Sequence, residues 1–261
     1  YIRISGTQHM EAVSSMPDWL AQMLHNLILT GQCTDIALEL NDSLMTKVLD
    51  SGTVSTSPDF VLTGTCTTSF QTSGANRSNN IVVGASRLNN LIVMPGQTVS
   101  VSDTILPRTR ANGYKEAGVY VNGAHTTGLG GGVCQISSTV YNAVKNAGLT
   151  ILQRNPHSMP VSYLPKGLDA AIAAGSKDLK FRNDYTTPVV LYTDTSNKHL
   201  TVNVLVWNQE LAGRSFKLWA KQTGALSADT YFTTYQNGKE VSTQFVGTSR
   251  YNPYREAVND D

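Results

Sequence analysis

The sequence predicts an α+β fold in which a mixed or antiparallel sheet supports a helix that carries a candidate nucleophile. Short segments rich in Val, Ile, Leu and Thr recur between turn residues, as strands do. Near the middle of the chain, residues 133–147 place apolar side chains at helical spacing. The 261 residues, 40% of them hydrophobic and 15% charged, suffice for the core of one large domain or two small ones.

The N-terminal third predicts a helix followed by strands and loops. PDWLAQMLHNLILT, residues 17–30, carries large apolar residues at helical spacing, and Gly31 follows as a stop. Residues 51–80 form a tract of Ser, Thr, Gly and Asn in which we expect strand and loop. The next run predicts a short helix over 80–90, a strand, a Pro-Gly-Gln turn and a second strand over 98–102.

The second half predicts one central helix among strands. A strand over 117–121, an NGA turn and a TTGLGGG loop lead into it. Its apolar stripe is Val133, Ile136, Val140, Val144 and Ala147. Gly148 supplies a left-handed stop. LTILQRN, VSYLP, TPVVLYTD and HLTVNVLVW then predict strands, the last two an antiparallel pair across DTSNK, and Asn237-Gly238 predicts a two-residue hairpin between YFTTY and EVSTQFV.

The charge balance argues against nucleic acid as a partner. Twenty basic residues face nineteen acidic ones, and charges of one sign are not clustered as a nucleic-acid-binding surface requires. The sequence holds no run of about 18 apolar residues, so it contains no predicted membrane span. Its start at Tyr1 and its Ser/Thr/Asn/Gly-rich composition favour an exported protein whose signal or membrane anchor lies outside this sequence.

Three cysteines are an odd number, which leaves one thiol over when a disulfide forms. Cys33 and Cys66 have similar Thr/Gly-flanked, strand-like contexts, so we expect a disulfide between them that closes a loop of about 30 residues. The alternative is that both are unpaired small hydrophobic residues. Cys134 lies in different surroundings.

Cys134 comes after three glycines and Val133, in the first turn of the predicted helix. Unpaired amides and the positive end of the helix dipole stabilise a thiolate there and lower its pKa from about 8.5. Gly131 and Gly132 allow close backbone approach, and the backbone amide of Gln135 is a candidate donor to an oxyanion. The pattern favours acyl transfer. The alternative is that Cys134 is merely a small buried residue at a helix start.

His157 is the best candidate for the base that a nucleophilic thiol needs. It follows Cys134 by 23 positions, so the chain can return beside the helix start. Asp169, 12 positions later, would orient the imidazole, although it is an equally good helix N-cap before AAIAA. His125, on the loop that leads to Cys134, is the alternative base. Arg154 would hold a substrate carboxylate or cap a strand.

No metal or organic cofactor is expected. The sequence contains no CxxC, no HExxH and no pair of histidines at helical distance. The glycine run lacks the Lys-Ser/Thr ending of a phosphate-binding loop.

The segment from Thr68 to Trp207 resembles the VanW family. The blocks that carry the resemblance are NRSNNIVVGASRLNNLIVMPGQTVS, LPRTRANGYKEAGVYVNG, GGGVCQISSTVYNAV, RNPHSMPVSYLPKGLDAAI and KDLKFRNDYTTPVVL. Family members are exported or membrane-anchored wall proteins, chiefly of Gram-positive bacteria, and some have been assigned L,D-transpeptidase activity. The resemblance implies that Cys134 carries an acyl-enzyme with His157 as its base.

The resemblance also implies a division of the chain and a substrate. Residues 1–66 would include the end of a peptidoglycan-binding-like region, 67–208 the catalytic domain and 209–261 a C-terminal β extension. The implied activity is cross-linking of peptidoglycan stem peptides through a thioester, outside the cell, in the wall or anchored to the outer face of the membrane. The alternatives are a cysteine peptidase or L,D-carboxypeptidase acting on the same peptides, and a non-catalytic wall-binding module.

The expected substrate-binding residues surround the cysteine and the histidine in the sequence. They are Gly131, Gly132, Gln135, Arg154, Ser158 and Tyr163. A thiol at a helix start followed by a histidine also resembles the arrangement in transglutaminases and papain-like enzymes.

Overall fold

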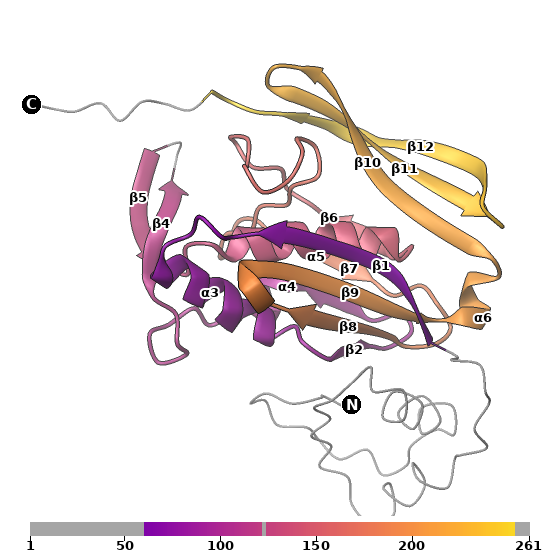
Figure 1. Ribbon diagram of the computed structural model, residues 1–261, viewed down its shortest axis with the longest axis horizontal. Coiled ribbons are helices and arrows are strands. Elements are labelled where there is room, and N and C mark those ends of the chain that lie inside the picture. The colour runs from indigo at the N-terminus through magenta and orange to yellow at the C-terminus, as the bar shows by residue number, and fades with distance from the viewer. Residues whose placement is uncertain (1–59, 122–123, 254–261) are drawn as a thin grey trace, which may run out of the picture.

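The computed structural model describes residues 60–121 and 124–253. Within these ranges the fold is α+β, and every pairing between strands is antiparallel (Figure 1). The predicted α+β class is therefore confirmed, with antiparallel sheets. The helix expected over 17–30 lies outside the described residues. None of the described helices is long and apolar enough to cross a membrane.

The main sheet joins segments that are far apart in the chain. In the order in which they pair, its strands are β1 (Phe60–Ser69), β9 (His199–Trp207), β8 (Val189–Asp194) and β2 (Leu91–Val93). In HLTVNVLVW the alternate side chains of Leu200, Val202 and Val204 are fully buried, so one face of the sheet covers the core. The predicted pairing of β8 with β9 is confirmed.

Three smaller sheets and a few helices complete the described part of the chain. The sheets comprise β3 (Thr98–Ser100), β7 (Lys180–Arg182) and β6 (Thr150–Gln153); β4 (Glu116–Val121) and β5 (Ala124–Leu129); and β10 (Arg214–Gly224), β11 (Ser227–Gln236) and β12 (Lys239–Arg250). The helices are α3 (Ala75–Ser86), α4 (Val101–Thr104), α5 (Val133–Asn146), α6 (Asn208–Leu211) and the 3-10 turn η1 (Ser196–Lys198).

Helix α5 lies between the main sheet and the β10–β12 sheet and is buried along almost its whole length (Figure 1). All five residues of the predicted apolar stripe are buried: Val133, Ile136, Val140, Val144 and Ala147. Gly148, with a φ of 83°, follows the helix as predicted. Gly64 lets β1 touch the helix, because a Cβ there would lie 2.1 Å from the Ala143 carbonyl oxygen.

Polar side chains of α5 are also buried, and they bind the backbone of residues 168–172. Ser137 Oγ donates to the carbonyl of Ala170 at 2.6 Å, and Ser138 Oγ accepts from the amide of Ala170 at 2.9 Å. Buried polar groups need such partners, so these bonds favour a single conformation of an irregular segment. They fix the position of Asp169, which belongs to that segment.

Helix α3 begins earlier than predicted, at residue 75 rather than near 80. The asparagines of NRSNN do not disrupt it because their side chains bind other segments. Asn80 Nδ2, for example, donates to the carbonyls of Lys115 at 2.8 Å and Gly131 at 3.0 Å. An asparagine with a distant partner no longer competes for the backbone of its own helix.

Two other predicted elements are wrong. VSYLP has no regular structure, and the prolines on either side of residues 161–164 cannot donate to a strand ladder. The expected TTGLGGG loop begins instead as strand β5, which pairs with β4 through residue 129. Pairing with β4 satisfies the backbone hydrogen-bonding groups of β5. Its Thr and Gly residues do not give the apolar pattern from which a buried strand is predicted.

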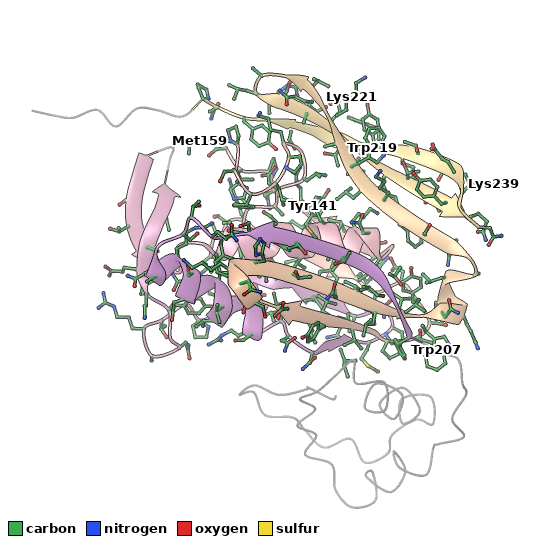
Figure 2. The ribbon with its side chains drawn as sticks, viewed as in Figure 1. Tyr141, Met159, Trp207, Trp219, Lys221 and Lys239 are labelled. Atoms are coloured by element: carbon green, nitrogen blue, oxygen red, sulfur yellow. The ribbon has the colours of Figure 1, made fainter. Side chains whose placement is uncertain are left out.

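The C-terminal extension forms the meander β10–β12, whose position is marked by Trp219, Lys221 and Lys239 in Figure 2. The predicted hairpin is confirmed, since Asn237 and Gly238 take φ values of 50° and 76° between β11 and β12. The expected boundary at 66/67 falls inside β1, so residues 60–66 share a sheet with the expected catalytic domain. The boundary at 208/209 falls in α6.

Candidate active site

A pocket of about 1290 Å³ lies at the N-terminal end of α5. Several parts of the chain line it: the start of α3 with the residues before it, Arg108, the β4–β5 ribbon with the glycine run, the first turn of α5, the loop 157–163, and residues 171–177. Cys134 and His157 both contribute to the lining. The structure therefore brings together two residues that are separated in the sequence by the rest of α5 and by β6.

Cys134 occupies the first turn of α5. The helix begins after Gly132, whose φ of 110° is a conformation that side chains with a Cβ rarely adopt. The first turn contains no acidic residue, so the positive end of the dipole acts on Cys134 without a local counter-charge. Cys134 Sγ lies 3.3 Å from the carbonyl oxygen of Ile172, to which the thiol donates.

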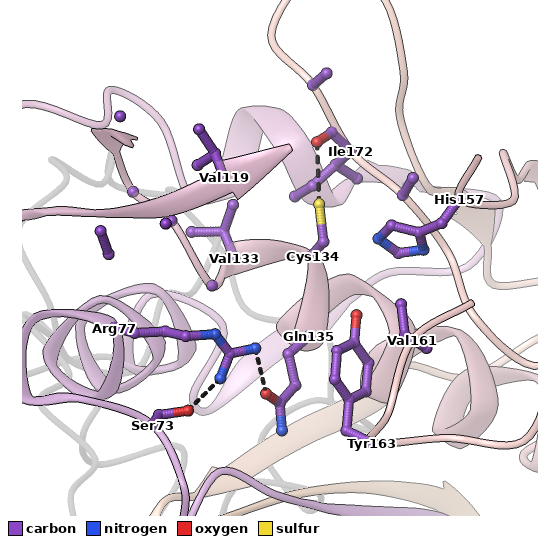
Figure 3. A pocket seen from close by; sticks show the side chains of 18 of the residues that line it. Ser73, Arg77, Val119, Val133, Cys134, Gln135, His157, Val161, Tyr163 and Ile172 are labelled. Atoms are coloured by element: carbon purple, nitrogen blue, oxygen red, sulfur yellow. Dashed lines mark hydrogen bonds between the residues drawn. The ribbon is translucent and has the colours of Figure 1, made fainter. Parts of the chain in front are cut away.

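The imidazole of His157 faces the sulfur of Cys134 (Figure 3). Its Nδ1 lies 2.7 Å from Asp169 Oδ2, which leaves Nε2 for the sulfur. The backbone amide of His157 donates to the same carboxylate oxygen at 2.7 Å. Asp169 thus fixes both the ring and the backbone of the residue that meets Cys134. Residues 170–174 form no helix, so the alternative role of Asp169 as an N-cap is wrong.

The carboxylate of Asp169 is buried but fully partnered. Its side chain is 1% exposed, and Oδ1 accepts from the hydroxyl of Tyr251 at 2.5 Å and from Arg154 Nη2 at 3.2 Å. Burial raises the pKa of the carboxyl, but the hydrogen bonds from His157 and Tyr251 and the Arg154 charge outweigh it, and the pKa falls to about 2. Asp169 is therefore an anion at neutral pH.

The same contacts favour an ion pair between Cys134 and His157. Burial raises the pKa of the thiol. The hydrogen bond and charge of His157, together with the Arg108 charge, lower it by more than burial raises it, so the net shift is downward. For His157, burial lowers the pKa, while Asp169 and Cys134 raise it to about 9. Both shifts favour a thiolate beside an imidazolium.

Arg154 does not reach the pocket as a substrate ligand would. Its Nε donates to the Asp169 carbonyl at 2.7 Å, and its Nη1 donates to Ser249 Oγ at 2.9 Å. Through these contacts and its bond to the Asp169 carboxylate, the Arg154 guanidinium links the segment around Asp169 to β12. The expectation that Arg154 holds a substrate carboxylate or caps a strand is therefore wrong.

Gln135 also has a structural role rather than the expected one. Its backbone amide donates to the Gly132 carbonyl at 3.0 Å, and its buried side chain donates to Thr68 Oγ1 and accepts from Arg77. The amide of Cys134 is the better oxyanion donor, because a helix leaves the amides of its first turn without an intrahelical acceptor.

The remaining expected residues lie around the pocket. Gly131 contacts the β4 backbone, since a Cβ there would lie 2.6 Å from the Gly118 carbonyl oxygen. Ser158 and Tyr163 line the pocket. Burial raises the pKa of Tyr163, so its hydroxyl stays neutral. His125, the alternative base, lies in β5, and the ring that meets Cys134 is that of His157.

Cys66 packs against the hydrophobic core and forms no disulfide with a cysteine in the described part of the chain. Burial raises its pKa to about 12, so it is inert near neutral pH. Its expected partner, Cys33, lies outside the described residues, and the disulfide stays a prediction.

Sequence reasoning missed Arg77, Arg108 and Tyr251. The first two line the pocket, and Tyr251 binds Asp169 from the residue that follows β12. None of the three has a sequence spacing that relates it to Cys134. Only the packing of α3, of the segment after α4 and of the C-terminal sheet brings them to the site.

Comparison with known proteins identifies the domain. Residues 76–205 match the family model described as VanW like protein. The chain belongs to the VanW family. It is 42% identical over 128 residues to the "Uncharacterized protein YoaR" of Bacillus subtilis and 37% identical over 114 residues to the "Vancomycin B-type resistance protein VanW" of Enterococcus faecalis.

These alignments cover 49% and 42% of this chain, and 42% of each relative, so the chain spans less than half of the curated relatives it matches. No solved structure matches. Tyr251 and Ser249, which complete the surroundings of Asp169, lie beyond the end of the VanW match at residue 205.

Tyr251→Phe tests whether the C-terminal segment supports the VanW site. We expect a loss of about 1–2 kcal/mol in the free energy of unfolding, because the hydroxyl both accepts from the Gly167 amide and donates to Asp169. The pKa of Asp169 should also rise, since the Tyr251 bond helps to lower it. Urea unfolding and carbon-13 titration of the carboxyl measure the two effects. Tyr235→Phe, on β11, should change neither, and an unchanged Asp169 titration in Tyr251→Phe would contradict the assigned role.

Proposed function

We propose that this VanW domain is a cysteine acyltransferase that cross-links peptidoglycan stem peptides, that is, an L,D-transpeptidase. The observation that supports the proposal is the continuous set of contacts from Asp169 to His157 to Cys134, in a pocket at the start of α5. The name of the Enterococcus faecalis relative, a vancomycin resistance protein, agrees with a substrate in the cell wall. We place the activity outside the cell, in the wall or at the outer face of the membrane.

In the first half-reaction the Cys134 thiolate attacks the carbonyl carbon of the third residue of a donor tetrapeptide. A carbon–sulfur bond forms, and the carbonyl oxygen takes up the negative charge, which the Cys134 amide and the helix dipole stabilise. The imidazolium of His157 then gives its Nε2 proton to the nitrogen of the fourth residue. The carbon–nitrogen bond breaks, and D-alanine leaves.

In the second half-reaction an amine of an acceptor stem attacks the thioester. His157 takes the proton of that amine, a new amide bond forms, and the carbon–sulfur bond breaks to restore the thiolate. Asp169 keeps the ring in one tautomer and stabilises its charged form throughout. With water in place of the amine, the same steps would make an L,D-carboxypeptidase.

Mass spectrometry of the full chain incubated with stem tetrapeptides tests the proposal. We expect an acyl adduct on Cys134 that lacks the mass of D-alanine, followed by a cross-linked product when an acceptor stem is present. Cys134→Ala should form neither product. Cys66→Ala is the matched control, because the Cys66 thiol is buried with a high pKa, and it should retain both products.

The outcome separates the candidate activities. A hydrolysed tripeptide without a cross-link would indicate a carboxypeptidase. If neither adduct nor product forms with the wild-type chain, or if both persist in Cys134→Ala, the acyltransferase proposal is wrong.

A further inference from the structure

Two arginines that take no part in the proposed reaction converge on the start of α5. Arg77 comes from α3 and Arg108 from the segment after α4, and both line the pocket. Each passes over a glycine of the GLGGG run. A Cβ at Gly132 would lie 2.9 Å from Arg77 Cγ, and one at Gly130 would lie 2.8 Å from Arg108 Cδ. These glycines therefore leave room for the two side chains beside Cys134.

Arg77 is held in a fixed orientation. Its Nη2 donates to Gln135 Oε1 at 2.8 Å, and its Nη1 donates to Ser73 Oγ (Figure 3). A guanidinium carries five N–H donors, so these two contacts orient the group without using all of them. The buried side chain of Gln135 therefore helps to orient Arg77.

Arg108 has no hydrogen bond or ion pair with any residue in the described part of the chain, and its Nη1 is buried there without a partner. A buried charged donor without an acceptor is costly, and such a group is rare in a folded protein unless a ligand supplies the acceptor. The unpaired donor lies on the wall of the same pocket that holds Cys134.

The charges around the pocket favour an anionic ligand. His157 and Lys177 add to the two arginines, and Glu116 is the acidic residue among the described lining residues. Glu116 is exposed and already paired with Arg110, so it does not neutralise the arginines. A carboxylate matches the planar fork of a guanidinium and can bind it through two hydrogen bonds.

The two sides of Cys134 would hold different halves of the substrate. Arg77 and His157 lie on opposite sides of Cys134 in Figure 3. In the proposed reaction His157 protonates the leaving nitrogen, so the leaving D-alanine lies on the His157 side. The half that stays attached as the acyl group then lies toward Arg77.

We propose that Arg77 and Arg108 form a subsite for a free carboxylate on the acyl half of the donor peptide. This inference rests on the proposed function for the assignment of the two halves. A stem peptide offers this chemistry in two places: the α-carboxylate that a γ-linked glutamate leaves free at position two, and the side-chain carboxylate of a diamino acid at position three.

Binding to the Cys134→Ala chain tests the subsite independently of catalysis. Isothermal titration calorimetry would compare a tetrapeptide carrying both carboxylates with two peptides, each amidated at one of the two positions. We expect one amidation to weaken binding by about 10- to 100-fold, which identifies the carboxylate that is bound. Arg108→Gln in the same background should remove this preference with no loss of thermal stability, because Arg108 has no partner among the described residues. Arg182→Gln, on β7, removes a partly exposed arginine that lies outside the pocket lining and should leave the preference intact.

The proposal is overturned if all three peptides bind equally, if none binds measurably, or if the preference survives Arg108→Gln. Failure of the proposed function gives a different result. In that case the wild-type chain forms no acyl adduct with any peptide, while the Cys134→Ala chain still prefers the carboxylate form.

Discussion

Replacing His157 with Gln should slow the alkylation of Cys134 by iodoacetamide at pH 6.5 by up to about a hundredfold. In the wild-type chain the hydrogen bond and charge of His157 outweigh the effect of burial and lower the pKa of the thiol. Without the imidazole, burial dominates, and the pKa returns to at least its usual range of about 8.5, where only about 1% of the thiol is ionised at pH 6.5. The rate profile against pH, followed by mass spectrometry of the Cys134 peptide, measures the shift directly.

The matched control is His199→Gln, since His199 lies in β9 and its Nδ1 contacts the carbonyl of Asn197, outside the pocket lining. Its alkylation profile should match that of the wild type. In the wild type the proposed acylation of Cys134 should also decline as the pH rises through about 9, because the imidazolium that protonates the leaving amine is lost there. A His157→Gln chain that alkylates as fast as the wild type at pH 6.5 would show that His157 does not activate Cys134.

Replacing Asp169 with Asn should cost both stability and activity. The carboxylate is 1% exposed and binds His157, Tyr251 and Arg154, so its loss leaves a partly buried guanidinium without its counter-charge. We expect a loss of about 3 kcal/mol in the free energy of unfolding at pH 5 and a fall of at least about a hundredfold in the proposed acylation, because the imidazole loses its orientation and the stabilisation of its charge.

The stability difference should depend on pH in a defined direction. The pKa of Asp169 is depressed in the folded chain from 3.8 to about 2, so its contribution is present above 3.8 and is lost as the pH falls through about 2. The gap in unfolding free energy between wild type and Asp169→Asn should therefore shrink by about 2 kcal/mol between pH 5 and pH 2. Urea unfolding at the two pH values measures it, with Asp103→Asn, an exposed position on α4, as the control. A gap that does not narrow in acid would show that the Asp169 charge is not stabilised in the fold.

Much of the local structure could be predicted from the sequence. The apolar stripe of α5, its glycine stop, the β8–β9 pair and the Asn237-Gly238 turn are all confirmed, because each depends on residues close together in the chain. The start of α3 could not be predicted, because the asparagines there bind residues distant in the sequence. The pairing of β5, a strand of Thr and Gly, could not be predicted either, because it depends on the neighbouring strand β4.

The candidate site likewise has features that depend on neighbouring residues and features that depend on tertiary packing. The sequence by itself determined that Cys134 stands at the start of a buried helix after a glycine run, because helix periodicity and glycine conformation act over a few residues. The tertiary structure alone decided that His157 meets the sulfur, that Arg154 and Tyr251 serve Asp169, and that Arg77 and Arg108 face the pocket. Those contacts join residues that only the packing of α5 against the sheets brings together, and spacing along the chain carries no information about them.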